Sequence, residues 1–424
     1  MNNNLFHTGL MSYVIKKIFY SIRNRRNFAF LILFILTLSF SACSKGKPTS
    51  GGDVDKPNEK FTIAVTEVEV ITSEEDTIND IVYGNGRFVA IGKNGKIAYS
   101  VDNGITWTAV KNSIFGTDEV NSTTNYSIVY GNKSFVAVRN EDKEEYHSRM
   151  AYSSDGIKWA IVKNAIFANG SIGSIAYGNG RFIALSSCLG ESGKIVYSAD
   201  NGATWKAVKN IIFSNDYYIS HITYVNDRFV AVGTWMWGCG PQGSFCDTIM
   251  AYSNDGITWK KAKKSKKQWW FSRYIYGNGY FVAIGGEEDM EYGWSDYIGY
   301  SNDGTTWTRI EDTTKENTSF SNGSINSIAY GNGRFVVVGT VGNEWDEDKG
   351  EYKTTGQMAY SSNGKTWTAV KNTTFGKDGI SCIAYCNDRF IAGGEKGKMA
   401  YSVDKGVTWI AVKDTTFGPN DKAK

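Results

Sequence analysis

Histidine and cysteine are scarce in this chain, with three histidines and six cysteines among 424 residues. None of them shows the close Cys/His spacing of a zinc site, so neither a metal centre nor another cofactor is expected. An excess of one charge is also lacking. The formal charge is +3, and residues 1–43 hold five Lys/Arg but no Asp/Glu, so the remainder carries −2. A chain this close to neutrality has no electrostatic reason to bind nucleic acid.

Long apolar runs are lacking except for one, Phe28 to Phe40, which follows a basic stretch and ends at Ser41-Ala42-Cys43. The run is too short to cross a membrane comfortably, and the pattern predicts an export signal over residues 1–43. Its ending, F-S-A-C, resembles a bacterial lipobox, in which Cys43 would be lipidated. Simple cleavage near Ala42 without a lipid stays open, as does a start at Met11 instead of Met1. We therefore expect a bacterial envelope protein that meets the membrane only through a lipid anchor.

Residues 44–60 are rich in Gly, Pro, Ser and charge, and they predict a flexible tether. The next stretch, Phe61 to Val70, reads F-T-I-A-V-T-E-V-E-V. It is similar to the last strand of each repeat described below. We expect it to pair at the outer edge of the final repeat.

Seven copies of one short motif dominate the rest of the chain. The first is Tyr99 to Trp107, Y-S-V-D-N-G-I-T-W, and the others begin at Tyr152, Tyr197, Tyr252, Tyr300, Tyr360 and Tyr401. An Asp or Asn side chain can accept hydrogen bonds from backbone N–H groups two residues on, and Gly adopts a positive φ. The Trp then returns to a sheet as an apolar plug. The motif therefore predicts a turn between two strands, with a structural rather than a catalytic carboxylate.

The seven copies resemble the Asp-box, or BNR, repeats of the sialidase-like β-propeller superfamily, over roughly residues 79–418. The resemblance implies one blade per box, in a superfamily that includes sialidases, xyloglucan hydrolases, sortilin-type receptors and non-catalytic binding proteins.

The strand pattern independently favours a propeller. Each unit has an inner strand such as 80–83, a tight G-N-G or N-D-R turn, a strand such as 87–91, a third such as 96–100 leading into the box, and a fourth such as 106–110. Consecutive apolar residues indicate sheets covered on both faces. The box tryptophans recur about every 50 residues, as in propeller blades. We predict an all-β, seven-bladed propeller over 61–424, with four antiparallel strands per blade. The blades are expected at about 77–116, 124–168, 171–214, 218–266, 271–314, 324–376 and 379–418.

Strand order predicts two unlike faces. The tight turns and the boxes share one face, and the long insertions share the other, where binding is expected. The predicted loops are 139–149, 186–193, 234–248, 286–297 and 340–357. Acidic runs within three of them suit calcium, but solvated charge is the favoured interpretation.

Six of the thirteen tryptophans lie outside the boxes, and all fall in the insertions or crossings of blades four to six: Trp235, Trp237, Trp269, Trp270, Trp294 and Trp345. One interpretation is an exposed platform that stacks on a glycan or seats a protein, with Trp269 and Trp270 at its centre. The other is a satellite core beneath the long loops.

Arg273 and His221 complete the candidate ligand-binding residues, His221 because it begins an inner strand near the channel. A sialidase would need three arginines for the substrate carboxylate, and only Arg139, Arg149 and Arg273 are plausible here. The F-R-I-P stretch usual before the first box of a sialidase is missing. We therefore favour a non-catalytic binding or scaffold protein, with a glycosidase as the alternative.

The cysteines carry two further expectations. Cys239 and Cys246 flank a short loop, G-P-Q-G-S-F, and in an exported protein they should form a disulfide. Cys382 and Cys386 should not pair, because four residues along a strand hold them roughly 13 Å apart.

Overall fold

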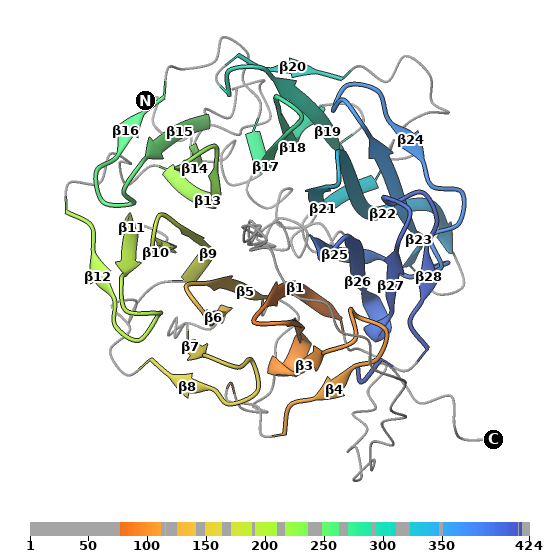
Figure 1. The fold of residues 1–424 in the computed structure, drawn as a ribbon. Helices are drawn as coiled ribbons and strands as arrows, with labels where there is room; N and C mark the ends of the chain where they lie inside the picture. Colours follow the sequence, from red (N-terminus) through yellow and green to blue (C-terminus); the bar gives the residue numbers. More distant parts are fainter. Residues whose placement is uncertain are drawn as a thin grey trace, which may run out of the picture.

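A computed structural model describes most of the repeat region. The described residues are 77–111, 115, 125–140, 149–162, 171–188, 191–209, 217–235, 248–262, 270–289, 293–304, 306–310, 323–346, 351–413 and 415–417. They form seven four-stranded antiparallel sheets arranged around a centre (Figure 1). The predicted seven-bladed propeller is confirmed. In this part of the chain no helix has the length and apolar character needed to span a bilayer.

Every blade is built from four strands that are consecutive in the chain. The inner strands line the centre: β1 (Ile78–Gly84), β5 (Asn125–Gly131), β9 (Ser171–Gly178), β13 (Tyr217–Val225), β17 (Trp270–Gly277), β21 (Gly323–Gly331) and β25 (Ile380–Cys386). The second strands are β2 (Arg87–Gly92), β6 (Ser134–Asn140), β10 (Arg181–Cys188), β14 (Arg228–Trp235), β18 (Tyr280–Asp289), β22 (Arg334–Asp346) and β26 (Arg389–Gly394).

The third strands lead into the boxes: β3 (Ile97–Ser100), β7 (Arg149–Ser153), β11 (Glu191–Ser198), β15 (Thr248–Ser253), β19 (Gly293–Ser301), β23 (Glu351–Ser361) and β27 (Met399–Ser402). The outer strands are only two residues long: β4 (Thr108–Ala109), β8 (Ala160–Ile161), β12 (Lys206–Ala207), β16 (Lys260–Lys261), β20 (Thr308–Arg309), β24 (Thr368–Ala369) and β28 (Ile410–Ala411). They are shorter than predicted because the Thr and Trp before them belong to the box turn.

The core lies between blades, as the consecutive apolar residues predicted. Phe88, Ala90 and Ile91 of β2 are fully buried, although neighbouring side chains on a strand point to opposite faces. The contact between blades seven and one resembles the others, with Ile78, Phe88 and Ile391 in one buried cluster. The ring is therefore closed by packing.

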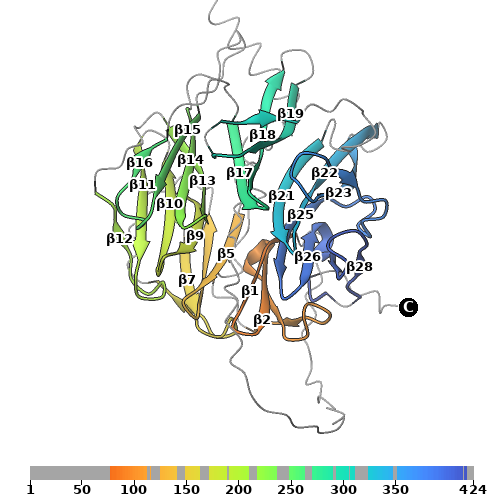
Figure 2. The same ribbon diagram turned by 45° about the horizontal axis from the view of Figure 1, so that its top comes forward.

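Strand length on the face opposite the boxes differs among blades. In blades one and seven, the second and third strands are joined by short 3-10 turns, η1 (Lys93–Gly95) and η2 (Glu395–Gly397). In blades five and six the same strands extend much further, and β18 and β19 rise above their neighbours in Figure 2. Much of the predicted loops 286–297 and 340–357 is therefore strand, because the pairing of the buried residues continues outward, without a shift in blade five and past a bulge between Gly342 and Glu344 in blade six.

Candidate functional site: two faces and a polar ring

Each Asp box is held by hydrogen bonds within its own turn. In the first box, Ser100 Oγ donates to Asp102 Oδ1 at 2.7 Å and accepts from the N–H of Gly104 at 2.8 Å. The Asp102 carboxylate also accepts from the backbone N–H of Thr106 at 2.9 Å and from its hydroxyl at 2.6 Å. Trp107 Nε1 donates to the Gly104 carbonyl at 3.1 Å. These bonds occupy the carboxylate, as the motif predicted.

The box carboxylates are strongly stabilised as anions. Partial burial raises the pKa of Asp255, but hydrogen bonds from Thr258, Ile257 and Ser253 outweigh it and lower that pKa to about 2. The same balance lowers the pKa of Asp102. A carboxyl group that stays ionised in this way is a poor general acid near neutral pH.

The tight turns bond to the box of the following blade. Asn85 Nδ2 donates to the Ser154 carbonyl at 3.1 Å, and Arg181 donates to that of Asp255 at 3.2 Å. The last blade repeats the pattern with the first, because Arg389 donates to the Asn103 carbonyl at 2.6 Å. We call this side, with its tight turns and boxes, the Asp-box face. Its tight-turn arginines, such as Arg181 and Arg389, therefore help to hold neighbouring blades together.

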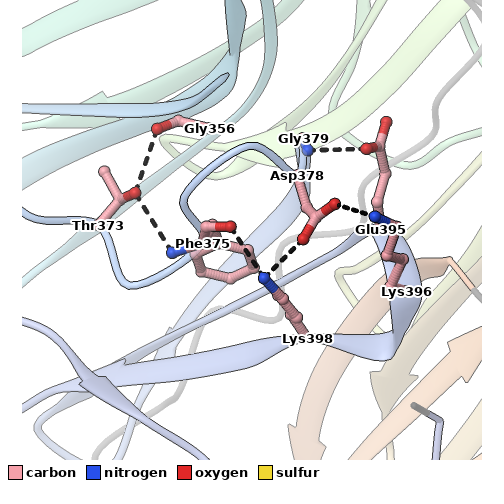
Figure 3. A network of polar contacts seen from close by, with 8 residues as sticks. All are labelled: Gly356, Thr373, Phe375, Asp378, Gly379, Glu395, Lys396 and Lys398. Carbon is pink, nitrogen blue, oxygen red and sulfur yellow. Dashed lines mark hydrogen bonds and ion pairs between the residues drawn. The ribbon is translucent and has the colours of Figure 1, made fainter. Parts of the chain in front are cut away.

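We call the opposite side of the ring the loop face. The strands extend only a short way towards it in blades one and seven, which form its low part, and much further in blades five and six. On blade seven a polar network fixes the short turn (Figure 3). Asp378 contacts Lys396 at 2.8 Å and Lys398 at 2.5 Å, and Glu395 accepts from the N–H of Gly379 at 2.9 Å. Further bonds join Thr373 and Phe375 to this network. These contacts hold the crossing into β25 close to the sheet.

Blades five and six form the high side of the loop face. The β18–β19 pairing continues to Asp289↔Gly293, and the β22–β23 pairing to Asp346↔Glu351. Between these blades, Asp296 Oδ2 accepts from the N–H of Ile325 at 2.7 Å. Burial raises the pKa of Asp296 to about 7 against the lowering effect of that bond. We call the two extended hairpins the crest.

Four of the six predicted platform tryptophans lie in strands that end on the loop face. Trp235 is the last residue of β14 and Trp270 is the first of β17, whereas Trp294 and Trp345 lie in the crest. Trp237 and Trp269 lie outside the described residues. The backbone thus carries four of the six to one face, and their role as a ligand platform stays a prediction.

The other two candidate residues, His221 and Arg273, belong to a ring of seven buried residues. His221 lies in the middle of β13, not at its start as predicted, because this strand begins at Tyr217. Each inner strand contributes one residue at the same register: Asp80, Ser127, Ser174, His221, Arg273, Ser327 and Cys382. None is more than 1 % exposed. We call this set the polar ring.

Several ring members bond to the next blade. Asp80 Oδ2 accepts from the N–H of Ile128 at 3.0 Å, and Ser174 Oγ accepts from that of Ile222 at 3.1 Å. Ser327 Oγ accepts from the N–H of Ile383 at 3.1 Å. The repeated bond gives the ring a structural role at the level where the blades are closest.

Burial shifts the pKa values of the ring's titratable groups. Burial raises the pKa of Asp80 to about 7, although hydrogen bonds from Ile128 and Ser127 and the charge of Arg273 lower it. Burial, and then the charge of Arg273, lowers the pKa of His221 to about 3. His221 Nε2 is buried and has no hydrogen-bond partner within the described residues. The imidazole is therefore neutral across the physiological range.

Apart from His221 and Arg273, the members of the polar ring were not among the residues predicted from the sequence. The signal for the ring was present, because alignment of the strands D-I-V-Y-G, S-I-V-Y-G and S-I-A-Y-G places one non-aliphatic residue at the same position in each repeat.

The three arginines that a sialidase would need for the substrate carboxylate lie in two separate parts of the structure. Arg139 and Arg149 face each other on β6 and β7, and both donate to the carbonyl of Phe115. Arg273 lies in the polar ring, where its charge acts on Asp80 and His221. The contacts of the described residues join Arg139 and Arg149, but they do not join either of them to Arg273.

The predictions about metals and disulfides can be compared with the structure only in part, because most of the cysteines concerned lie outside the described residues. Within the described ranges no three His, Cys, Asp or Glu side chains are grouped so as to hold a metal. Cys43, Cys239 and Cys246 lie outside those ranges, as does the stretch 61–70, so their predictions stay open. Cys382 is a buried free thiol, so it is not bridged to Cys386, as predicted.

Comparison with protein families agrees with the box geometry. Residues 98–109, which span the first box, match the BNR/Asp-box repeat. No curated protein shows significant similarity to the chain.

Solved structures share the fold at low sequence identity. A structure of YCF48 bound to D1 peptide is 15 % identical with a TM-score of 0.52, and the match covers 77 % of this chain and 93 % of that one. A prolyl endopeptidase structure is 9 % identical with a TM-score of 0.51, covering 80 % of this chain and 50 % of that one. The GH74 enzyme of Niastella koreensis is 15 % identical over 78 % of this chain and 64 % of that one, but its TM-score of 0.39 is too low to carry an argument. At these identities the likeness concerns the fold alone.

Proposed function

We propose that this seven-bladed Asp-box propeller is a non-catalytic binding protein of the bacterial cell envelope, which presents its loop face to a glycan or protein ligand. The observation that carries the proposal is the unevenness of that face. The second strand has six residues in blades one and seven but ten in blade five and thirteen in blade six. A ring held by seven similar inter-blade contacts does not need this extension, so we assign it to recognition.

The tryptophans support the same face. Trp270, Trp294 and Trp345 lie in the loop-face ends of strands in blades five and six. These two blades are neighbours in the ring. Tryptophan is enriched at binding sites because it contributes a large rigid surface, and it also stacks on sugar rings. The propeller YCF48, whose structure contains a D1 peptide, supports counting extended peptides among the ligands to be tested.

Hydrolysis is less well supported than binding. The box carboxylates and the pair Arg139 and Arg149 are all engaged in holding backbone groups. Arg273 and His221 are each 1 % exposed. The alternative function, a glycosidase of the sialidase-like superfamily, would need a catalytic site built from other residues of the loop face.

The proposal is tested by screening the full chain against glycan and peptide arrays, and then shortening the crest. In the shortened variant, residues 342–354 are replaced by Glu395-Lys396-Gly397, the turn that blade seven already uses. We expect the affinity for any ligand found to fall at least about tenfold, because a central aromatic group is removed. A second variant, Trp269→Ala with Trp270→Ala, tests the predicted platform without changing the backbone length.

The matched control is Asn85→Ala with Asn179→Ala on the Asp-box face, which should leave affinity unchanged. Unaltered binding by both loop-face variants, with a normal melting profile, would contradict the assignment. Turnover of fluorogenic sialosides or other glycosides by the parent, kept in the Asn85→Ala and Asn179→Ala control but lost in the shortened variant, would favour the glycosidase.

A further inference from the structure

Exposed aliphatic side chains are unevenly distributed among the boxes and the outer strands that follow them. We call this outer margin of the Asp-box face the Asp-box rim. Six large hydrophobic side chains are exposed among the described residues, between 37 % and 65 %: Val101, Ile105, Ile161, Val403, Val407 and Ile410. Val403, Val407 and Ile410 belong to blade seven, Val101 and Ile105 to blade one, and Ile161 to blade two. These three blades are consecutive in the closed ring. Among the side chains that the structure describes in blades three to six, no large hydrophobic one is exposed in this way.

Four of the six occupy variable positions of the box itself. Val101 and Val403 stand between the box Ser and Asp, where the other boxes have Ser154, Ala199, Asn254, Asn302 and Ser362. Ile105 and Val407 follow the box Gly. The turn forms equally well with polar residues at the first position, so its hydrogen bonds do not explain the valines. Ile410 and Ile161 lie in the outer strands that leave boxes seven and two.

We propose that these six side chains form a membrane-contacting arc, by which blades seven, one and two rest on the surface of a lipid bilayer, a contact in addition to the lipid anchor that the sequence alone led us to expect. Single exposed aliphatic residues are ordinary, but a group of them confined to one rim marks an interaction site. The arc contains only Val and Ile, whereas protein interfaces concentrate Trp, Tyr and Arg at their centres. Six small side chains spread over three blades also bury too little area for a stable dimer. Insertion of short aliphatic side chains into a bilayer needs no complementary surface, because its strength scales with the apolar area that is buried.

The path of the chain agrees with this partner. The predicted lipid anchor at Cys43 precedes blade one, which is the middle blade of the arc. The described chain begins at residue 77, and the intervening 33 residues have a root-mean-square span of roughly 30 Å if flexible. The anchor can therefore reach the same membrane that the arc would touch.

The orientation that follows would suit the proposed function without depending on it. In a seven-membered ring, the blades opposite blade one are blades four and five, beside the crest on blade six. With the arc on the membrane, the tryptophan-bearing side of the loop face would be the part of the molecule farthest from the bilayer.

The repeats supply internal controls for a test by hydrogen–deuterium exchange with mass spectrometry. The full chain is compared in detergent micelles and in liposomes of phosphatidylethanolamine and phosphatidylglycerol. We expect amides of box one (Tyr99–Trp107) and box seven (Tyr401–Trp409) to exchange several-fold more slowly in liposomes. Amides of box four (Tyr252–Trp259) should exchange equally in both. Equal exchange for all boxes would overturn the proposal.

A variant built from residues that other boxes already carry separates contact from folding. Val101→Ser, Ile105→Thr, Val403→Asn and Val407→Thr together should abolish the liposome-dependent protection, while Asn254→Ser with Asn302→Ser should leave it intact. Protection that survives the fourfold variant would also overturn the proposal. Protection that depends on protein concentration in micelles would instead identify a second copy of the chain as the partner. None of these outcomes affects ligand binding by the loop face, so the two proposals fail independently.

Discussion

The buried imidazole of His221 makes the stability of the ring depend on pH. Its folded pKa of about 3 lies below the value of about 6.5 for an unfolded histidine. Unfolding therefore takes up a proton between these two values, and stability is lost as the pH falls through this range. His221→Gln should remove that loss, so the variant should gain on the parent below pH 6.5, by up to about 1.4 kcal/mol per pH unit. Urea unfolding at pH 7.5, 6 and 4.5 measures the difference.

Asp80 makes the stability depend on pH in the opposite direction. Its folded pKa of about 7 lies above the unfolded value of 3.8, so the folded state holds the proton more tightly and stability falls as the pH rises from about 4 to about 7. Asp80→Asn should therefore gain on the parent with rising pH. Parallel pH profiles for the parent and both variants would show that neither group titrates on unfolding.

Individual residues were predictable where their role is local. The box sequence specifies its own turn, so the bonds that Asp102 accepts followed from the motif, whereas the bond from Trp107 to the Gly104 carbonyl was not predicted. The polar ring was not predicted, because its members differ in type from blade to blade and meet only when the ring closes. Asp80 contacts Ser127 across 47 positions of sequence. Aligned repeats reveal the shared position, but they do not reveal which side chains contact one another between blades.

At the scale of the strand, the packing between blades depends on glycine at the end of the inner strand. A Cβ on Gly84 would lie 2.1 Å from the ring of Tyr130 in the next blade, whereas one on Gly86, with φ of 75°, would meet nothing within 4 Å. Four further glycines face tyrosines in the same way: Gly131, Gly178, Gly277 and Gly331. The two glycines of the first turn thus serve different purposes, one for packing and one for backbone conformation.

Two alanine substitutions separate these purposes. Gly84→Ala should cost about 1–3 kcal/mol through overpacking against Tyr130. Gly86→Ala should cost about 1–2 kcal/mol through left-handed strain alone. Adding Tyr130→Leu, which removes the close ring, should relieve the first cost but not the second. Denaturant unfolding of the single and double variants checks this, and simple additivity at Gly84 would contradict the proposed contact.

The positions of the strands were also easier to predict from the sequence than their lengths. The consecutive apolar residues of β2 predicted burial on both faces, and the tight turns marked its beginning. The lengths of β22 and β23 were not predictable, because G-N-E-W-D and E-Y-K-T-T have the composition of a loop. Their pairing extends the buried pairs below them past a bulge between Gly342 and Glu344, and composition does not record such an extension.

At the scale of the whole molecule, the seam between blades seven and one contains a natural reporter. The Cys382 thiol is fully buried there, 3.7 Å from the carbonyl of Ile78, and burial raises its pKa well above the ordinary value. Alkylation of Cys382 should therefore require the seam to open. Arg389→Ala removes the bond to Asn103 across this seam and should raise the labelling rate about fivefold, as expected for ~1 kcal/mol.

The matched control is Arg181→Ala, which removes the equivalent bond between blades three and four. It should leave the labelling of Cys382 near the parent rate, measured by mass spectrometry of the peptide that contains this residue. Equal acceleration by the two variants would mean that the ring has no preferred point of opening.

The continuity of each blade in the chain affects how such a protein can evolve. Because every described sheet takes its four strands from one continuous segment, a duplicated or deleted segment of about 50 residues adds or removes a complete blade. No strand elsewhere must find a new partner. For the same reason the repeat region could be opened at any of its seven blade-to-blade crossings and still supply seven complete blades.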